Sequence, residues 1–78
     1  MAIPLPKATP FDHTPRLRTA YLEFYARGYE FAATSPGYAS LGCACESEGD
    51  DERYDAMVNG FYAGRAAGAA AYAAKHMR

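Results

Sequence analysis

Large apolar side chains recur at helical spacing in two stretches of the chain, and the stretch between them has no such period. In residues 14–34 the intervals are four, three, four and three, which indicate one helix face. The members of this face are Leu17, Tyr21, Phe24, Gly28 and Phe31. A second stripe lies beside it and consists of Leu22, Tyr25 and Tyr29. A small amphipathic helix needs only one buried face, so the second stripe indicates contact with a partner or with the protein's own N-terminal residues.

Local signals set the limits of this first helix. Thr14 is a suitable N-cap, and Pro15 suits the first helical position because its missing N–H would have no partner there. The turn-forming run at residues 34–37 (Thr-Ser-Pro-Gly) ends the helix. Prolines at positions 4, 6, 10 and 15 favour extended backbone before it. Residues 1–13 are therefore predicted to form an extended, proline-rich arm.

A second helix is predicted over residues 51–76, where carboxylates in the first turn suit the positive end of the helix dipole. Gly60, Gly64 and Gly68 follow one another at intervals of one helical turn. Each glycine in a helix interior costs roughly 0.5–1 kcal/mol relative to alanine, so three on one stripe indicate a second backbone packed closely against them. Gly28 offers the matching small residue on the first helix.

The sequence thus predicts an all-α fold. It consists of a two-helix hairpin with an extended proline-rich arm and a long acidic inter-helix loop at residues 35–50. Residues 1–78 form a single small helical domain. Two helices bury little area, so self-association or a tightly bound partner is expected.

Composition and charge narrow the classes of function. The 78 residues are 50% hydrophobic, contain no tryptophan, and carry seven tyrosines and four phenylalanines. This excludes a large enzyme with its own cofactor fold and a disordered tail. The net charge of −1 disfavours direct nucleic-acid binding. This small net charge is the sum of an acidic belt over residues 36–55 and a basic segment over residues 56–78. The acidic belt has two interpretations: a contact for a basic protein surface, or a solvated loop before a helix.

Catalytic and metal-binding chemistry is not expected. Cys43, Cys45, His13 and His76 are nominal zinc ligands, but their spacing matches no known zinc finger. Residues 46–52 do not match the register of an EF-hand calcium loop. Neither histidine is held near a nucleophile, and no phosphate-binding glycine motif occurs. We therefore expect no enzymatic activity, no metal and no cofactor.

The absence of a signal sequence or a membrane-spanning run favours a cytoplasmic protein with free thiols.

More tyrosines are present than two helices can bury, and tyrosine is favoured at protein interfaces. The expected contact residues for a partner are the tyrosines of the two helices and the acidic belt: Tyr21, Tyr25, Tyr29, Glu46, Glu48, Asp50, Asp51, Glu52 and Tyr62.

Two short motifs resemble the ribosome modulation factor family of small bacterial, phage and plasmid proteins, which includes the Rmf and CrpP-like proteins. These motifs are residues 26–29 (Ala-Arg-Gly-Tyr) and residues 57–61 (Met-Val-Asn-Gly-Phe). The resemblance implies two short helices joined by a loop, and a ribosome-binding hibernation or modulation factor. RNA phosphates would then be bound by Arg16, Arg18, Arg27, Arg65 and Lys75.

Three functions remain open on the sequence. The first is a phage- or mobile-element-encoded inhibitor that binds a host nucleic-acid-handling complex through aromatic helix faces and an acidic loop, as an anti-CRISPR protein does. The second is the ribosome-binding factor. The third is a structural protein that forms a homodimer through the stripe of Gly60, Gly64 and Gly68.

Overall fold

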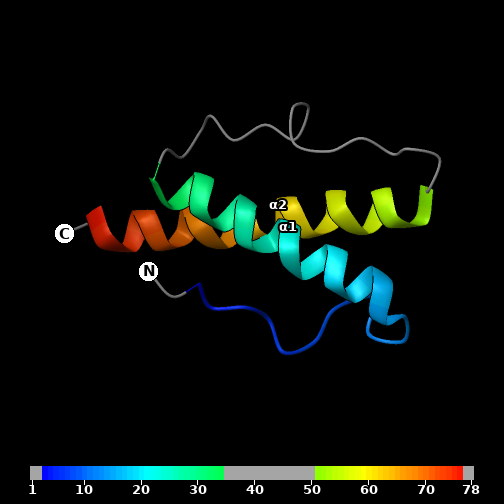
Figure 1. Cartoon of the computed structure of the whole chain (residues 1–78). Coiled ribbons are helices and arrows are strands. Elements are labelled where there is room, and N and C mark those ends of the chain that lie inside the picture. The colour runs from blue at the N-terminus through cyan, green and yellow to red at the C-terminus, as the bar shows by residue number, and fades with distance from the viewer. Residues whose placement is uncertain (1–2, 35–50, 77–78) are drawn as a thin grey trace.

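The computed structural model describes residues 3–34 and 51–76, and in these residues the protein has two helices and no strand (Figure 1). Helix α1 spans Pro15–Thr34, and helix α2 spans Asp51–His76, the same residues as the expected second helix. Neither of these two helices contains a stretch long and apolar enough to cross a membrane. The expected acidic loop lies outside the described residues.

The start of α1 follows the local signals in the sequence. The carbonyl oxygen of Thr14 accepts the first helical hydrogen bond, from the N–H of Arg18 at 2.9 Å, which is the bond that an N-cap residue accepts. The N–H of Thr14 donates to the carbonyl oxygen of Phe11 at 3.0 Å and closes a turn just before the helix. At the other end, the hydroxyl of Thr34 donates to the carbonyl oxygen of Glu30 at 2.7 Å.

The hydrophobic core lies between the two helices. Phe61 is its only large side chain with no exposed surface in the described part of the chain. The remaining core residues come from both helices: Leu17, Ala20, Tyr21, Phe24, Ala56 and Met57. Phe31, which the spacing places on the buried face of α1, is 49% exposed, whereas Tyr29 and Ala32 are buried. The buried face therefore turns toward Ala32 in the last part of α1, and Phe31 lies beside it against the ring of Phe61.

The glycines of α2 let the two backbones touch. A Cβ atom built on Gly60, Gly64 or Gly68 would come closer than 3.0 Å to a backbone carbonyl oxygen of α1. The three carbonyl groups belong to residues one turn apart, namely Tyr21, Tyr25 and Tyr29. A Cβ on Gly28 would collide in the same way with the backbone of α2 at Phe61. All four glycines are buried.

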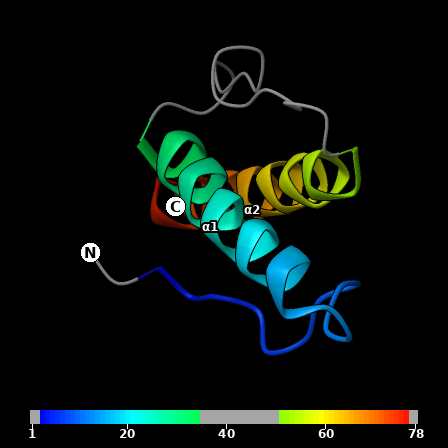
Figure 2. The same ribbon diagram turned by 45° about the vertical axis from the view of Figure 1, so that its right-hand side comes forward.

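This contact also shows the direction of the helices. Gly60 faces Tyr21, Gly64 faces Tyr25, and Gly68 faces Tyr29. Residue numbers thus rise together along both helices, so α1 and α2 run in the same direction and cross near their middles (Figures 1 and 2). The expected hairpin is therefore a parallel pair, not a pair of antiparallel neighbours.

The length of the connection allows the parallel arrangement. Helix α1 has 20 residues and is about 30 Å long at 1.5 Å per residue. Residues 35–50 reach about 50 Å when extended, which is enough to return to the other end of the pair. A short turn would have forced antiparallel neighbours.

The glycine stripe is not available for a second chain. Gly60, Gly64 and Gly68 are covered by α1 within the same chain. A homodimer through this stripe, one of the functions open on the sequence, would require α1 to leave α2. The structure therefore contradicts that form of pairing for the folded chain, because the close approach is already used intramolecularly.

The described part of the arm, residues 3–13, contains no helix or strand. It runs back along the helix pair from the start of α1 towards the C-terminal end of α2 (Figures 1 and 2). Phe11 is partly buried against the core, and Ile3 is partly buried as well, whereas Leu5 is 49% exposed.

Replacing Gly64 by alanine tests the close approach. At an ordinary position in a helix this change is stabilising by roughly 0.5–1 kcal/mol. Here the new Cβ meets the carbonyl group of Tyr25, so we expect a loss of about 1–3 kcal/mol. Thermal unfolding, monitored by circular dichroism, measures whether the change stabilises or destabilises the folded protein. Ala66→Leu adds bulk to the exposed side of the same helix and should leave the unfolding temperature nearly unchanged. A higher unfolding temperature for G64A would contradict the contact.

Candidate functional site

The predicted contact residues that the structure describes do not form one surface. Tyr21 and Tyr29 are buried, at 8% and 9% exposure, and Tyr25 is partly buried, whereas Tyr62 is 47% exposed. Asp51 and Glu52 are exposed in the first turn of α2, about 15 Å before Tyr62 along the helix. Glu46, Glu48 and Asp50 lie outside the described residues. A partner could therefore contact the rings of the two buried tyrosines only after the residues that cover them had moved.

A cluster of aromatic rings reaches the surface on one side of the pair. The ring of buried Phe61 lies 6.3 Å from the ring of Phe31 and 5.7 Å from that of Tyr62, centroid to centroid. Phe31 and Tyr62 are each about half exposed. The guanidinium group of Arg65 lies 5.7 Å from the ring centre of Tyr62, within the range of a cation–π contact. We call Phe31, Tyr62 and Arg65 the aromatic surface.

The aromatic surface adjoins a hollow on α1. Arg27, Glu30, Phe31 and Thr34 line this hollow. The guanidinium group of Arg27 lies 4.7 Å from the ring centre of Phe24 and pairs with Glu23 at 3.3 Å. Arg65 has no ion pair with a carboxylate among residues 3–34 and 51–76. The aromatic surface thus presents apolar rings beside a cation that an incoming acidic group could pair with.

Sequence reasoning placed Phe31 in the core and gave Arg65 only a role in RNA binding, not one beside the ring of Tyr62. The spacing placed Phe31 in the core, because a helical period does not show which of two neighbouring stripes lies nearest the partner helix. Arg65 stands three residues after Tyr62, which is a separation at which helical side chains meet. That spacing was the available signal for the cation–π contact.

On the other flank, the tyrosines of α1 form a ladder at intervals of one turn, which we call the tyrosine ladder: Tyr21, Tyr25 and Tyr29. The rings of Tyr21 and Tyr25 stack at 6.4 Å. Burial raises the pKa of Tyr25 above its ordinary 10.0, and its neighbours Tyr21 and Tyr29 raise it further. The ring of Phe11 from the arm lies 5.9 Å from that of Tyr21 and covers this end of the ladder.

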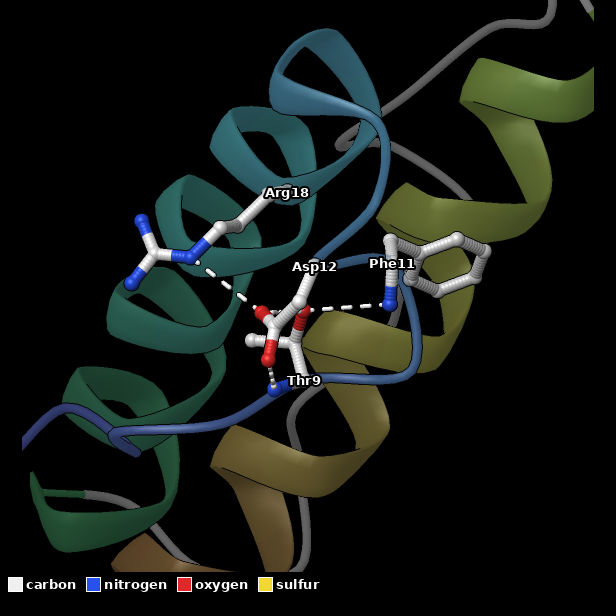
Figure 3. Close-up of polar contacts among 4 residues, drawn as sticks. All are labelled: Thr9, Phe11, Asp12 and Arg18. Carbon is white, nitrogen blue, oxygen red and sulfur yellow. Dashed lines mark hydrogen bonds and ion pairs between the residues drawn. The ribbon is translucent and has the colours of Figure 1, made fainter.

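A set of hydrogen bonds around Asp12 joins the arm to α1 (Figure 3). One carboxylate oxygen of Asp12 accepts from the N–H of Thr9 at 3.0 Å, and the other accepts from the hydroxyl of Thr9 at 2.8 Å. The Nε of Arg18 donates to the second oxygen at 3.2 Å. The hydroxyl oxygen of Thr9 in turn accepts from the N–H of Phe11 at 3.1 Å. We call these four residues the Asp12 clip.

The clip favours the charged form of Asp12. The backbone N–H of Thr9 lowers the pKa of this carboxyl group most, followed by the hydroxyl of Thr9, and Arg18 lowers it further. A carboxyl group with a depressed pKa stabilises the folded form above its ordinary pKa of 3.8. This contribution is lost as the pH falls through the lower, folded value. The lowered pKa of Asp12 therefore favours the closed clip at neutral pH, and this contribution decreases in acid.

The nominal metal ligands are not assembled in the described residues. Residues 3–34 and 51–76 contain no group of three or more His, Cys, Asp or Glu side chains that could hold a metal ion. The ring of His76 lies 4.2 Å from that of Tyr72 in the last turn of α2. Cys43 and Cys45 lie outside the described residues, so their expected free-thiol state stays a prediction.

No protein-family model matches the chain, and neither a curated protein nor a solved structure matches it. The resemblance to the ribosome modulation factor family therefore stays a prediction based on two short motifs.

The pKa of Asp12 reports directly on the clip. Replacing Thr9 by valine removes the hydroxyl that donates to the carboxylate, so we expect the pKa of Asp12 to rise towards 3.8. Titration of the Asp12 carboxyl carbon by NMR measures this change. Thr19→Val, a matched change at an exposed residue of α1, should leave the pKa of Asp12 unchanged. An equal Asp12 pKa in wild type and T9V would show that the hydroxyl bond does not form in solution.

Proposed function

We propose that this protein is a small non-enzymatic inhibitor that binds a host protein complex and blocks its access to nucleic acid, in the manner of an anti-CRISPR protein. A phage or another mobile element is the expected source of such a protein. The aromatic surface and the acidic belt are the contact regions in this proposal, and the site of action is the cytoplasm.

The aromatic surface is the observation that carries the proposal. Two half-exposed rings, Phe31 and Tyr62, rest on a fully buried third ring, so their positions are held by the core. Arg65 adds a cation over one of them. Tyrosine, phenylalanine and arginine are enriched at protein interfaces, and tyrosine and arginine also contribute most of the binding energy. Rings held in place lose little conformational entropy on binding.

The acidic residues of the described part support a second, electrostatic contact. Asp51, Glu52 and Asp55 are exposed at the start of α2. Complexes that handle nucleic acids present basic surfaces to the phosphate backbone. Acidic side chains steer a protein towards such surfaces and raise its association rate.

The alternative proposal, a ribosome-binding factor, depends on free basic side chains. Of the residues that would bind RNA phosphates, Arg18 pairs with Asp12 and Arg27 pairs with Glu23. At least two of the five cations are thus compensated by carboxylates within residues 3–34 and 51–76. This pairing disfavours RNA as the partner, because phosphate binding depends on uncompensated positive charge.

Removing the two exposed rings tests the aromatic contact. With the chain immobilised and a purified, guide-loaded CRISPR effector as the probe, we expect the double variant Phe31→Ala/Tyr62→Ala to weaken binding by about 30-fold or more. Surface plasmon resonance measures the affinity. Leu5→Ala is the control, since it removes an apolar side chain of 49% exposure that lies in neither contact region. Equal loss in both variants, or co-sedimentation of the wild-type chain with ribosomes instead of effector binding, would contradict the proposal.

Replacing four residues of the acidic belt tests the electrostatic contact. Replacing Glu46, Glu48, Asp50 and Asp51 by alanine removes four negative charges. We expect slower association with the same effector, and a smaller dependence of the association rate on salt concentration. Association rates measured from low to high salt, for the wild type and the variant, give this comparison. If the variant binds like the wild type at every salt concentration, the acidic contact does not exist.

A further inference from the structure

The arm covers one end of the tyrosine ladder. The ring of Phe11 lies 5.9 Å from that of Tyr21, which in turn stacks on Tyr25 at 6.4 Å. Tyr21 is only 8% exposed, although it lies on the flank of the pair from which the arm approaches. Phe11 is itself only partly buried. The arm therefore packs on the outside of the helix pair, with its Phe11 ring against Tyr21.

The polar hold on the arm depends on one carboxylate. Asp12 accepts two hydrogen bonds from Thr9 and one from Arg18, and the Thr9 hydroxyl is held in position to accept from the N–H of Phe11 (Figure 3). The side chains of Asp12 and Arg18 are 38% and 42% exposed. Hydrogen bonds and ion pairs in contact with water contribute little individually. Loss of the carboxylate removes the bond from Arg18, which joins the arm to α1, and the two bonds from Thr9, which hold the arm's own turn. The Thr9 hydroxyl is then free to turn away from Phe11.

The helix pair does not depend on the arm in the same way. The contact of Gly60 and Gly64 with the carbonyl groups of α1 involves the two helices alone. The centre of the core, Phe61, is fully buried, and its ring contacts are with Phe31 and Tyr62. These contacts of the helix pair do not include the arm, whose Phe11 packs against the core.

We propose that residues 3–13 form a releasable strap. With the Asp12 clip closed, the strap covers Tyr21, on which Tyr25 stacks. With the clip open, the strap leaves the helix pair and exposes these two rings as a second apolar surface. That a partner then uses the exposed rings rests on the proposed function, whereas the opening of the strap does not.

The experiment compares the full-length chain with its Asp12→Ala variant. Trypsin cleavage after Lys7, followed by mass spectrometry, reports release of the strap. We expect cleavage about ten times faster in D12A, since three hydrogen bonds, one to a charged guanidinium, are lost. The dye 8-anilinonaphthalene-1-sulfonate, which binds exposed apolar surface, should fluoresce more strongly with D12A. The helical circular dichroism signal should stay that of the wild type, because the helix pair remains folded.

Glu23→Ala is the matched control. It removes one exposed carboxylate that pairs with an arginine at 3.3 Å, but within α1 and away from the arm, so its cleavage and dye fluorescence should equal those of the wild type. Thr9→Val removes the hydroxyl that donates to Asp12 and leaves the bond from Arg18 in place, so it weakens the clip and should change cleavage and dye fluorescence in the same direction as D12A, by less. Should D12A unfold, Thr9→Val decides the question by the same readouts.

Three results would overturn the strap. One is cleavage of both clip variants at the rate of E23A, because the clip then holds nothing. Another is faster cleavage without a rise in dye fluorescence, since the strap then covers no apolar surface. The third is loss of helical signal in both clip variants, which would make the arm an integral part of the fold. None of these readouts involves a partner, so failure of the proposed function would leave them unchanged.

Discussion

The contact between the glycines of α2 and the backbone carbonyl groups of α1 is the constraint on which the rest of the structure depends. The hydrogen that Gly64 carries in place of Cβ points at the carbonyl oxygen of Tyr25, and the same relation repeats one turn before and one turn after it. This geometry suits weak Cα–H···O hydrogen bonds, which recur between packed helices. Because any side chain would collide, the contact fixes the distance between the helices, their register and their common direction.

So close an approach leaves no room for a ring at the glycine positions themselves, and the aromatic side chains of the core pack beside this line of contact. On one flank, buried Phe61 supports the exposed rings of Phe31 and Tyr62. On the other flank, Tyr21 and Tyr25 stack on each other, and the ring of Phe11 from the arm packs against Tyr21. The glycine contact thus leaves aromatic rings on both flanks of the pair.

The parallel direction also shapes the electrostatics. The positive ends of both helix dipoles lie at the same end of the pair, where negative charge is stabilising. Helix α2 carries Asp51 and Glu52 in its first turn, whereas α1 has no acidic residue in its own. Asp12, in the turn just before α1, is the nearest carboxylate on the N-terminal side of that helix, and it is held there by Thr9 and Arg18. The arm thus brings its carboxylate close to the helix end that lacks one.

The sequence by itself determined the local features: two helices, the start of α1 after Thr14, the span of α2, and the close packing indicated by glycines one turn apart. These follow from caps, prolines and periodicity within a few residues. Only the tertiary structure decided that the helices run in parallel, that Tyr29 is buried while Phe31 is exposed, and that Asp12 clips the arm to α1. The helix direction and the exposure of Phe31 depend on the register between segments far apart in the chain, and the clip depends on the turn that joins the arm to α1. Periodicity within one helix carries no information about either.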